Sequence, residues 1–270
     1  MSEFDLTPDT HINIRPSGVN SFMACPKKWA AQTLMGYRGW GSFATVRGTG
    51  VHAGAEAIWR ESISAGSKII NISRAQDAAV ESVEKAFEEE DIRLDKDDFT
   101  ETKDGAKDSA AAGAAIYCEM AEKIEIPKFV EHNMSIDLGD NITVRGTADF
   151  IGHDGIVEDI KTSTSKSDPK KHTAQLGVYA RLADLNGIKA DLDNARIQNI
   201  AYNKSKTVGH LLPFKLNMTL TSYLINTLKE RTILVRQNPY ELDLLFPANP
   251  SSYLCNPKYC SYWDDCEAHG

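Results

Sequence analysis

The sequence has no long apolar run and no apolar leader segment. Nowhere among its 270 residues do about 18 consecutive apolar residues occur, the length that a membrane-spanning helix needs. The first residues are polar and acidic and lack the basic and apolar regions of a signal peptide. We therefore expect no membrane contact and a cytoplasmic location. Since a reducing cytosol disfavours structural disulfides, the five cysteines call for another explanation.

The sequence also lacks an excess of positive charge. Its 30 lysines and arginines face 38 aspartates and glutamates, which gives a formal net charge of −8. Proteins that coat nucleic acid are usually basic, so this balance argues against a passive coat. It still allows an enzyme with a local basic groove beside an acidic site. The candidate cations for such a groove are Arg15, Lys27, Lys28, Arg47, Lys204 and Lys206.

The chain contains no Gly-Lys-Ser/Thr phosphate-binding loop, no helicase motif and no repeat at solenoid spacing. Any unwinding of a duplex would therefore need a partner. Apolar residues make up 41% and charged residues 25% of the chain, which is typical of a globular protein with a real core. The length suits one domain over residues 1–270.

Helix and strand signals divide the chain into a helical first half and a mixed second half. Helices are expected at 17–35, 52–64, 73–91, 106–123, 171–185 and 219–238, and strands at 134–152, 156–161, 196–203 and 209–216. The glycine-rich segment 36–50 is expected to be flexible and cationic. We therefore expect an α/β fold with a helical part at 15–130, an α/β core at 131–240 and a cysteine-rich tail at 241–270.

Two carboxylates and one lysine are expected to meet on a strand hairpin. Asp159 and Lys161 share one strand face, and Glu158 points to the other. A three-residue turn that ends at Gly155 places Asp149 directly opposite Asp159. Opposed like charges destabilise a strand pair, and Mg²⁺ or Mn²⁺ between them would relieve the repulsion. Glu158 stays an alternative acidic member, although strand parity favours Asp159.

Two further pairs lie on expected helices at a spacing of four residues, which puts each pair on one helix face. They are His52 with Glu56, and Gln175 with Tyr179. Each pair alone is common on helix surfaces. Their order along the chain is informative, because His52 comes first, the hairpin follows and Gln175 comes last.

This order resembles the RecB-like branch of the PD-(D/E)XK nuclease superfamily, which includes the RecB and AddB nuclease domains, CRISPR-associated RecB-like nucleases and phage exonucleases. Four segments are similar to its histidine, first acidic, acid-x-lysine and Gln-x-x-x-Tyr motifs, in that order: GTGVHAGAEAIW (48–59), GTADFIG (146–152), EDIKT (158–162) and QLGVYA (175–180). The resemblance implies a restriction-endonuclease-like core, with a central mixed sheet flanked by helices.

The resemblance also implies roles for single residues. The implied ligands of Mg²⁺ or Mn²⁺ are His52, Asp149, Asp159 and the backbone carbonyl of Ile160. Lys161 would orient the attacking water and offset phosphate charge. Gln175 and Tyr179 would contact DNA or brace the site.

Four cysteines resemble the iron–sulfur clasp of AddB-type and CRISPR-associated nucleases, in which one early and three late cysteines hold a 4Fe–4S cluster. They are Cys25, Cys255, Cys260 and Cys266, whereas Cys118 stands alone in an alanine-rich segment. The family commonly has two residues between the first two late cysteines, and this chain has four. A structural Zn²⁺ site and unliganded thiols therefore stay open as alternatives.

The expected function is a metal-dependent deoxyribonuclease, and specifically an exonuclease that processes DNA ends in recombination, repair or phage DNA metabolism. Its substrate would be single-stranded DNA or duplex ends, and a recombinase, helicase or integrase would be a fitting partner. The alternatives are a CRISPR-associated nuclease in spacer acquisition, a non-catalytic DNA-binding or assembly module of the same fold, and an RNA-directed nuclease.

Overall fold

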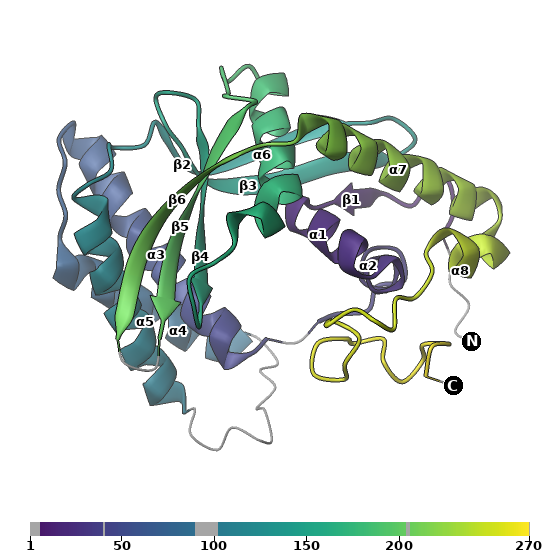
Figure 1. Ribbon diagram of the computed structural model, residues 1–270, viewed down its shortest axis with the longest axis horizontal. Helices are drawn as coiled ribbons and strands as arrows, with labels where there is room; N and C mark the ends of the chain where they lie inside the picture. Colours follow the sequence, from purple (N-terminus) through teal and green to yellow (C-terminus); the bar gives the residue numbers. More distant parts are fainter. Residues whose placement is uncertain (1–5, 40, 90–101, 204–205, 270) are drawn as a thin grey trace.

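The computed structural model describes residues 6–39, 41–89, 102–203 and 206–269 of the chain (Figure 1). Its centre is a six-stranded mixed sheet flanked by helices, which confirms the predicted α/β class. The strands are β1 (Ile12–Ile14), β2 (Phe129–Asp137), β3 (Ile142–Ile151), β4 (Val157–Ser163), β5 (Asn194–Tyr202) and β6 (Thr207–Lys215). Their order is β1-β3-β4-β5-β6, and β2 pairs with β3.

The helices form two groups. One group packs into a bundle beside β4 to β6, and it comprises α3 (Phe43–Ala65), α4 (Ile72–Glu89) and α5 (Lys103–Ala121). The other lies on the β1 side, and it comprises α1 (Pro16–Ala24), α2 (Pro26–Thr33), α6 (Thr173–Leu185), α7 (Met218–Gln237) and α8 (Leu242–Leu245), with short 3₁₀ turns at Pro169–His172 and Pro239–Glu241. Each group has its own apolar core. No helix in the described part of the chain is long and apolar enough to cross a membrane.

The expected first helix at 17–35 is wrong, because the chain forms two helices there. Cys25 separates α1 from α2 and has an extended backbone, with φ −157° and ψ 102°. Pro26 explains the break, since a proline ring disfavours the helical conformation in the residue before it. The break exposes the Cys25 backbone and side chain to the C-terminal tail.

The segment 36–50 is also less irregular than predicted, because α3 begins at Phe43 rather than at residue 52. The Ser42 side chain caps the helix by accepting a hydrogen bond from the Thr45 backbone N–H. Gly54 inside the helix allows α4 to approach closely, because a Cβ there would lie 2.7 Å from the Ala75 carbonyl oxygen.

The long strand expected at 134–152 is a hairpin. β2 and β3 pair in antiparallel fashion around a turn in which Gly139, Asp140 and Asn141 all have positive φ angles, of 80°, 55° and 54°. The second hairpin matches the prediction, since Gly155 has φ 83° and Phe150 pairs with Glu158. The ladder ends at Phe150–Glu158, so Asp149 and Asp159 follow directly after the last pair and are not themselves paired.

Candidate active site

The site lies where one edge of β3 has no strand partner. β2 covers one edge of β3 along almost its whole length. On the other edge β1 pairs with residues 142–144, and β4 pairs only with residues 150–151. The intervening residues 145–149 therefore face a gap in the sheet. Beside the gap, Pro16 of α1 and Tyr179 of α6 both lie against Gly146, on the face of the sheet.

Asp149 stands at the point where β3 and β4 separate. Its Oδ2 accepts a hydrogen bond from the Ile160 backbone N–H at 2.7 Å. The same oxygen lies 3.4 Å from Nδ1 of His52, on α3. Nε2 of His52 lies 3.1 Å from the Ile160 carbonyl oxygen. Three residues that the sequence predicted as metal ligands thus contact one another.

Asp159 forms a second part of the site with the residues around it. Lys161 Nζ lies 2.7 Å from Asp159 Oδ2, as expected for two side chains on one strand face. Gln175 of α6 donates from Nε2 to Asp159 Oδ1 at 3.2 Å. Asn20 of α1 donates to Gln175 Oε1 at 3.4 Å, a contact that the sequence did not predict. Two helices therefore fix the orientation of this carboxylate.

Glu131 is a member of the site that sequence reasoning missed. It lies on β2, at the register position opposite Asp149, and has a positive φ of 46°. One ligand atom each from His52, Glu131 and Asp149 lies within 4.8 Å of the others. Carboxylates from three neighbouring strands thus converge at the gap. The turn at Gly139 was the sequence signal that could have identified this residue. The turn folds β2 back along β3 and so brings Glu131 beside Asp149.

The electrostatics of the site reflect crowded negative charge. Burial raises the pKa of Asp159 to about 6, with Asp149 adding to the rise and Lys161 opposing it. Burial, followed by the charge of Asp149, raises the pKa of Glu131 to about 7. Burial alone would lower the pKa of His52, but Asp149 raises it to about 9. Carboxylates that repel one another in a buried place attract a cation.

Glu158 points away from this cluster, as strand parity predicted. It accepts hydrogen bonds from Arg196 Nη1 at 2.5 Å and from Gln198 Nε2 at 2.7 Å on the opposite side of β4. Both of its oxygens therefore have partners from β5. Tyr179 is buried beside the cluster, and burial together with Asp149 raises the pKa of its hydroxyl, so the phenol stays protonated.

The residues fit a divalent metal ion. Two carboxylates and one imidazole offer hard oxygen and nitrogen ligands at mutually compatible distances. Asp159 lies outside this group of three, and its oxygens contact Lys161 and Gln175. The predicted ligand set and the observed group therefore share His52 and Asp149, and the structure adds Glu131.

The C-terminal tail packs against α2, where Cys25 begins the helix. The Asn249 backbone N–H lies 3.5 Å from Cys25 Sγ. Cys260 and Cys266 are buried in a small apolar cluster with Ala31. Burial raises the pKa of the Cys255 thiol, and Cys25 and Cys260 raise it further, so these thiols are near neighbours. Cys118 is buried far along the chain in the core of the helical bundle.

Two predicted DNA contacts are buried beneath this tail. Lys27 is only 2% exposed and forms ion pairs with Asp243 and, at 3.3 Å, with Glu267. Lys28 is also buried, beside Cys25 and Cys260, and burial lowers its pKa. The Lys27 ammonium group is therefore engaged by acidic residues of the C-terminal segment and is not available to DNA.

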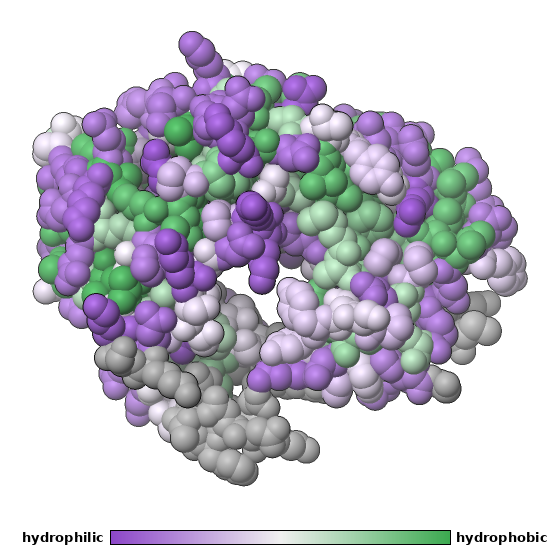
Figure 2. Space-filling model, viewed as in Figure 1, coloured by the Kyte–Doolittle hydropathy of each residue, from purple (hydrophilic) through white to green (hydrophobic). Residues whose placement is uncertain are grey.

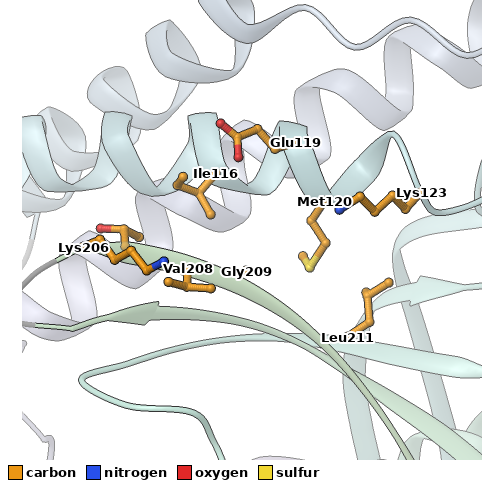
Figure 3. A pocket seen from close by; sticks show the side chains of 9 residues that line it. Ile116, Glu119, Met120, Lys123, Lys206, Val208, Gly209 and Leu211 are labelled. Atoms are coloured by element: carbon orange, nitrogen blue, oxygen red, sulfur yellow. The ribbon is translucent and has the colours of Figure 1, made fainter.

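The other predicted cations lie in different places. Arg15 is exposed just before α1, and Arg47 of α3 stacks over the Tyr202 ring, with its guanidinium carbon 4.4 Å from the centroid. Lys206 lines a pocket of about 420 Å³ between α5 and β6, which shares no residue with the carboxylate cluster (Figure 3). Lys204 lies outside the described residues.

Comparison with known proteins identifies the family. The sequence profile of the PD-(D/E)XK nuclease superfamily matches residues 14–267, and the chain belongs to this superfamily. Its nucleases use divalent metal ions. The prediction of the superfamily is therefore confirmed.

Two solved structures are similar to the chain. One is a putative exonuclease from Eubacterium rectale, with 14% identity, a TM-score of 0.49 and coverage of 86% of this chain and 80% of that chain. The other is SSO0001, with 20% identity, a TM-score of 0.35 and coverage of 60% and 72% respectively. No curated protein matches the chain.

Proposed function

We propose that the protein is a metal-dependent deoxyribonuclease of the RecB-like branch, which acts as an exonuclease on DNA ends in recombination, repair or phage DNA metabolism. The convergence of Asp149, Asp159 and Lys161 at the gap in the sheet carries this proposal. Membership of the superfamily and the order of the four motifs support it. A recombinase, helicase or integrase would supply the duplex opening for which the chain has no motif.

Each residue has a role that its contacts explain. His52, Glu131 and Asp149 would hold Mg²⁺ or Mn²⁺, with Asp159 and the Ile160 carbonyl completing the site. The bound ion supplies Lewis acidity for the phosphate and lowers the pKa of water. The chain contributes positioning, because hydrogen bonds from β4 and α6 fix the two aspartates.

Lys161 is suited to the water and the phosphate. Its side chain is 27% exposed and its ammonium group touches Asp159, so it reaches solvent at the mouth of the gap. There the cation would orient the attacking water and offset the charge that develops on the phosphate. Gln175 keeps the Asp159 carboxylate directed towards Lys161.

The surface around the gap offers a path for a strand. Figure 2 shows a hollow between the helical bundle and the α1–α2 side, with hydrophilic residues on its rim. We propose that the substrate strand lies in this hollow and reaches the carboxylates and Lys161 from there.

We also propose that Cys25, Cys255, Cys260 and Cys266 hold a 4Fe–4S cluster. Four soft thiols suit such a cluster, and three of them affect one another electrostatically. A structural Zn²⁺ ion held by the same four thiolates is the alternative that the test below separates from the cluster. Anaerobically purified protein should absorb in the visible range, and a colourless protein with stoichiometric zinc would contradict this proposal.

The nuclease proposal is tested with end-labelled single- and double-stranded DNA in Mg²⁺, Mn²⁺ and EDTA. We expect shortened products with either metal and none with EDTA. Asp159→Ala and Lys161→Ala should abolish cleavage and keep the circular dichroism spectrum of the wild type. Lys123→Ala is the matched control and should cleave normally, because this lysine lines the pocket between α5 and β6 and not the carboxylate cluster. Full activity in Asp159→Ala or Lys161→Ala would refute the assignment.

A further inference from the structure

The cations that the sequence predicted for DNA binding do not surround the carboxylate cluster. Lys27 pairs with Asp243 and Glu267, and Lys206 lines a separate pocket between α5 and β6. The proposed site concentrates negative charge, and the whole chain carries a net charge of −8. Each phosphate of a DNA strand adds a further negative charge, so cations beside the site must offset the repulsion.

Such cations lie on the connection between β4 and α6, residues 164–172, which we call the β4–α6 segment. Residues 161–172, which include the segment, contain four lysines and one aspartate, so their formal charge is +3 with histidine neutral. Three of these lysines, Lys166, Lys170 and Lys171, belong to the segment itself and are exposed. Within the described part of the chain, none of the three forms an ion pair. Their charge is therefore available to an external anion.

Both ends of the β4–α6 segment are close to the proposed active site. Lys161, whose ammonium group touches Asp159, precedes the segment by three residues. Gln175, which donates to Asp159, follows His172 by three residues, less than one turn of α6. Burial, followed by the charge of Lys161, lowers the pKa of His172 to about 4, and Lys171 adds to the effect. The segment thus lies within electrostatic reach of Lys161.

Asn199 of β5 holds the segment against the end of β4. Its buried side chain donates to the Lys161 carbonyl oxygen at 2.9 Å and to Ser163 Oγ at 2.8 Å, and it accepts from the Ser167 backbone N–H at 2.9 Å. Asparagine is disfavoured in strands, and a buried amide is costly unless it is hydrogen-bonded. These bonds fix the segment relative to Lys161. A surface that is fixed in advance loses little conformational entropy when it binds a ligand.

We propose that the β4–α6 segment binds the backbone of the substrate DNA strand beside the phosphate that Lys161 faces, with Lys166, Lys170 and Lys171 each against a phosphate. The inference rests on the proposed nuclease function, because it assigns backbone contacts to that enzyme's substrate. Phosphate contacts carry no direct sequence information, so this binding depends on salt and not on base sequence.

Salt dependence measures these contacts without cleavage. Fluorescence anisotropy in EDTA gives the Kd of a labelled oligothymidine of about twelve nucleotides between about 50 and 200 mM salt. Each phosphate contact to a single strand contributes about 0.7 to the slope of log Kd against log salt concentration. A triple variant with Lys166→Gln, Lys170→Gln and Lys171→Gln should therefore lower the slope by about 2. It should also raise the Kd at low salt about tenfold to a hundredfold, the combined effect of three exposed charge contacts.

A matched control removes the same charge at the other end of β4. Lys128→Gln, Lys189→Gln and Lys215→Gln change three exposed lysines that lie near the start of this strand. Salt screens charges over about 10 Å at 0.1 M, so the control should keep the slope and should change the Kd less than about twofold. Both triple variants should keep the circular dichroism spectrum of the wild type, because all six side chains are exposed.

Cleavage kinetics connect the segment to the active site. With Mn²⁺, the KM for the same oligonucleotide should rise in the segment variant by about the same factor as the Kd. An unchanged salt slope in this variant, or an equal change in both triple variants, would overturn the proposal. A raised Kd without a raised KM would also overturn it, because the contact would then lie away from the cleaved strand. A wild type that binds the oligonucleotide but does not cleave it would instead contradict the nuclease function, and the salt slopes would still decide whether the segment binds DNA.

Discussion

Glu131 provides the sharpest test of the electrostatics of the site. Its carboxylate and that of Asp149 approach within 4.8 Å. At an effective dielectric constant of about 20, two unit charges at this distance repel by roughly 3 kcal/mol, and solvent reduces this value. Glu131→Gln keeps the shape and removes the charge. In EDTA at pH 8 we expect the free energy of unfolding to rise by about 1–2 kcal/mol.

The pH dependence of this effect has a defined sign. Burial and then Asp149 raise the pKa of Glu131 from 4.5 to about 7 in the metal-free protein. A raised carboxyl pKa stabilises the fold fully below pH 4.5, and this contribution is lost as the pH rises through about 7. Glutamine does not titrate. The advantage of Glu131→Gln over wild type should therefore be present at pH 8 and shrink towards pH 5.

Urea unfolding in EDTA at the two pH values measures this difference, and Mn²⁺ titration completes the test. Mn²⁺ should raise the melting temperature of wild type more than that of the variant, because the variant lacks a ligand. Glu125→Gln, at an exposed position, is the control and should change stability by less than about 0.5 kcal/mol. Equal stability of Glu131→Gln and wild type at pH 8, with equal responses to Mn²⁺, would refute the reasoning.

Two further predictions concern single contacts. Asp149→Ala should be less stable than Asp149→Asn by about 1–3 kcal/mol in EDTA, because only alanine leaves the Ile160 N–H without an acceptor; equal urea midpoints would contradict this. Cys25→Ser should lower the melting temperature more than Cys118→Ser, because only Cys25 joins α2 to the tail. Equal losses would contradict the clasp.

The sequence predicts the β3–β4 hairpin well because its cues are local. Strand alternation puts Asp159 and Lys161 on one face, and Gly155 with its positive φ fixes the register in which Phe150 pairs with Glu158. Both cues act over a few residues, and nothing elsewhere in the fold competes with them. The same reasoning separated Glu158 from the cluster, and its contacts with β5 agree.

Long-range packing limits what the sequence predicts. Glu131 joins the site only because β2 folds back along β3, and the turn residues that cause this were read as continuous strand. A lysine is usually exposed on the surface, so Lys27 was expected there. It is buried because it pairs with acidic residues more than 200 positions further along the chain. Neither result follows from the residues near these positions. The break before Pro26, by contrast, was a local signal that favours two helices.

The gap in the sheet and the catalytic cluster have a common cause at Ile160. In an antiparallel ladder, hydrogen-bonded pairs alternate, so after Gly152–Ile156 and Phe150–Glu158 the next pair would join Ala148 to Ile160. Side chains bind the two backbone groups of Ile160 instead: Asp149 takes its N–H and His52 lies against its carbonyl. The side chains proposed to hold the metal ion thus take the place of the backbone hydrogen bonds that would otherwise pair β3 with β4 at this point. The strands stay apart while both backbone groups of Ile160 keep a side-chain partner, and the carboxylates lie in the space between the strands.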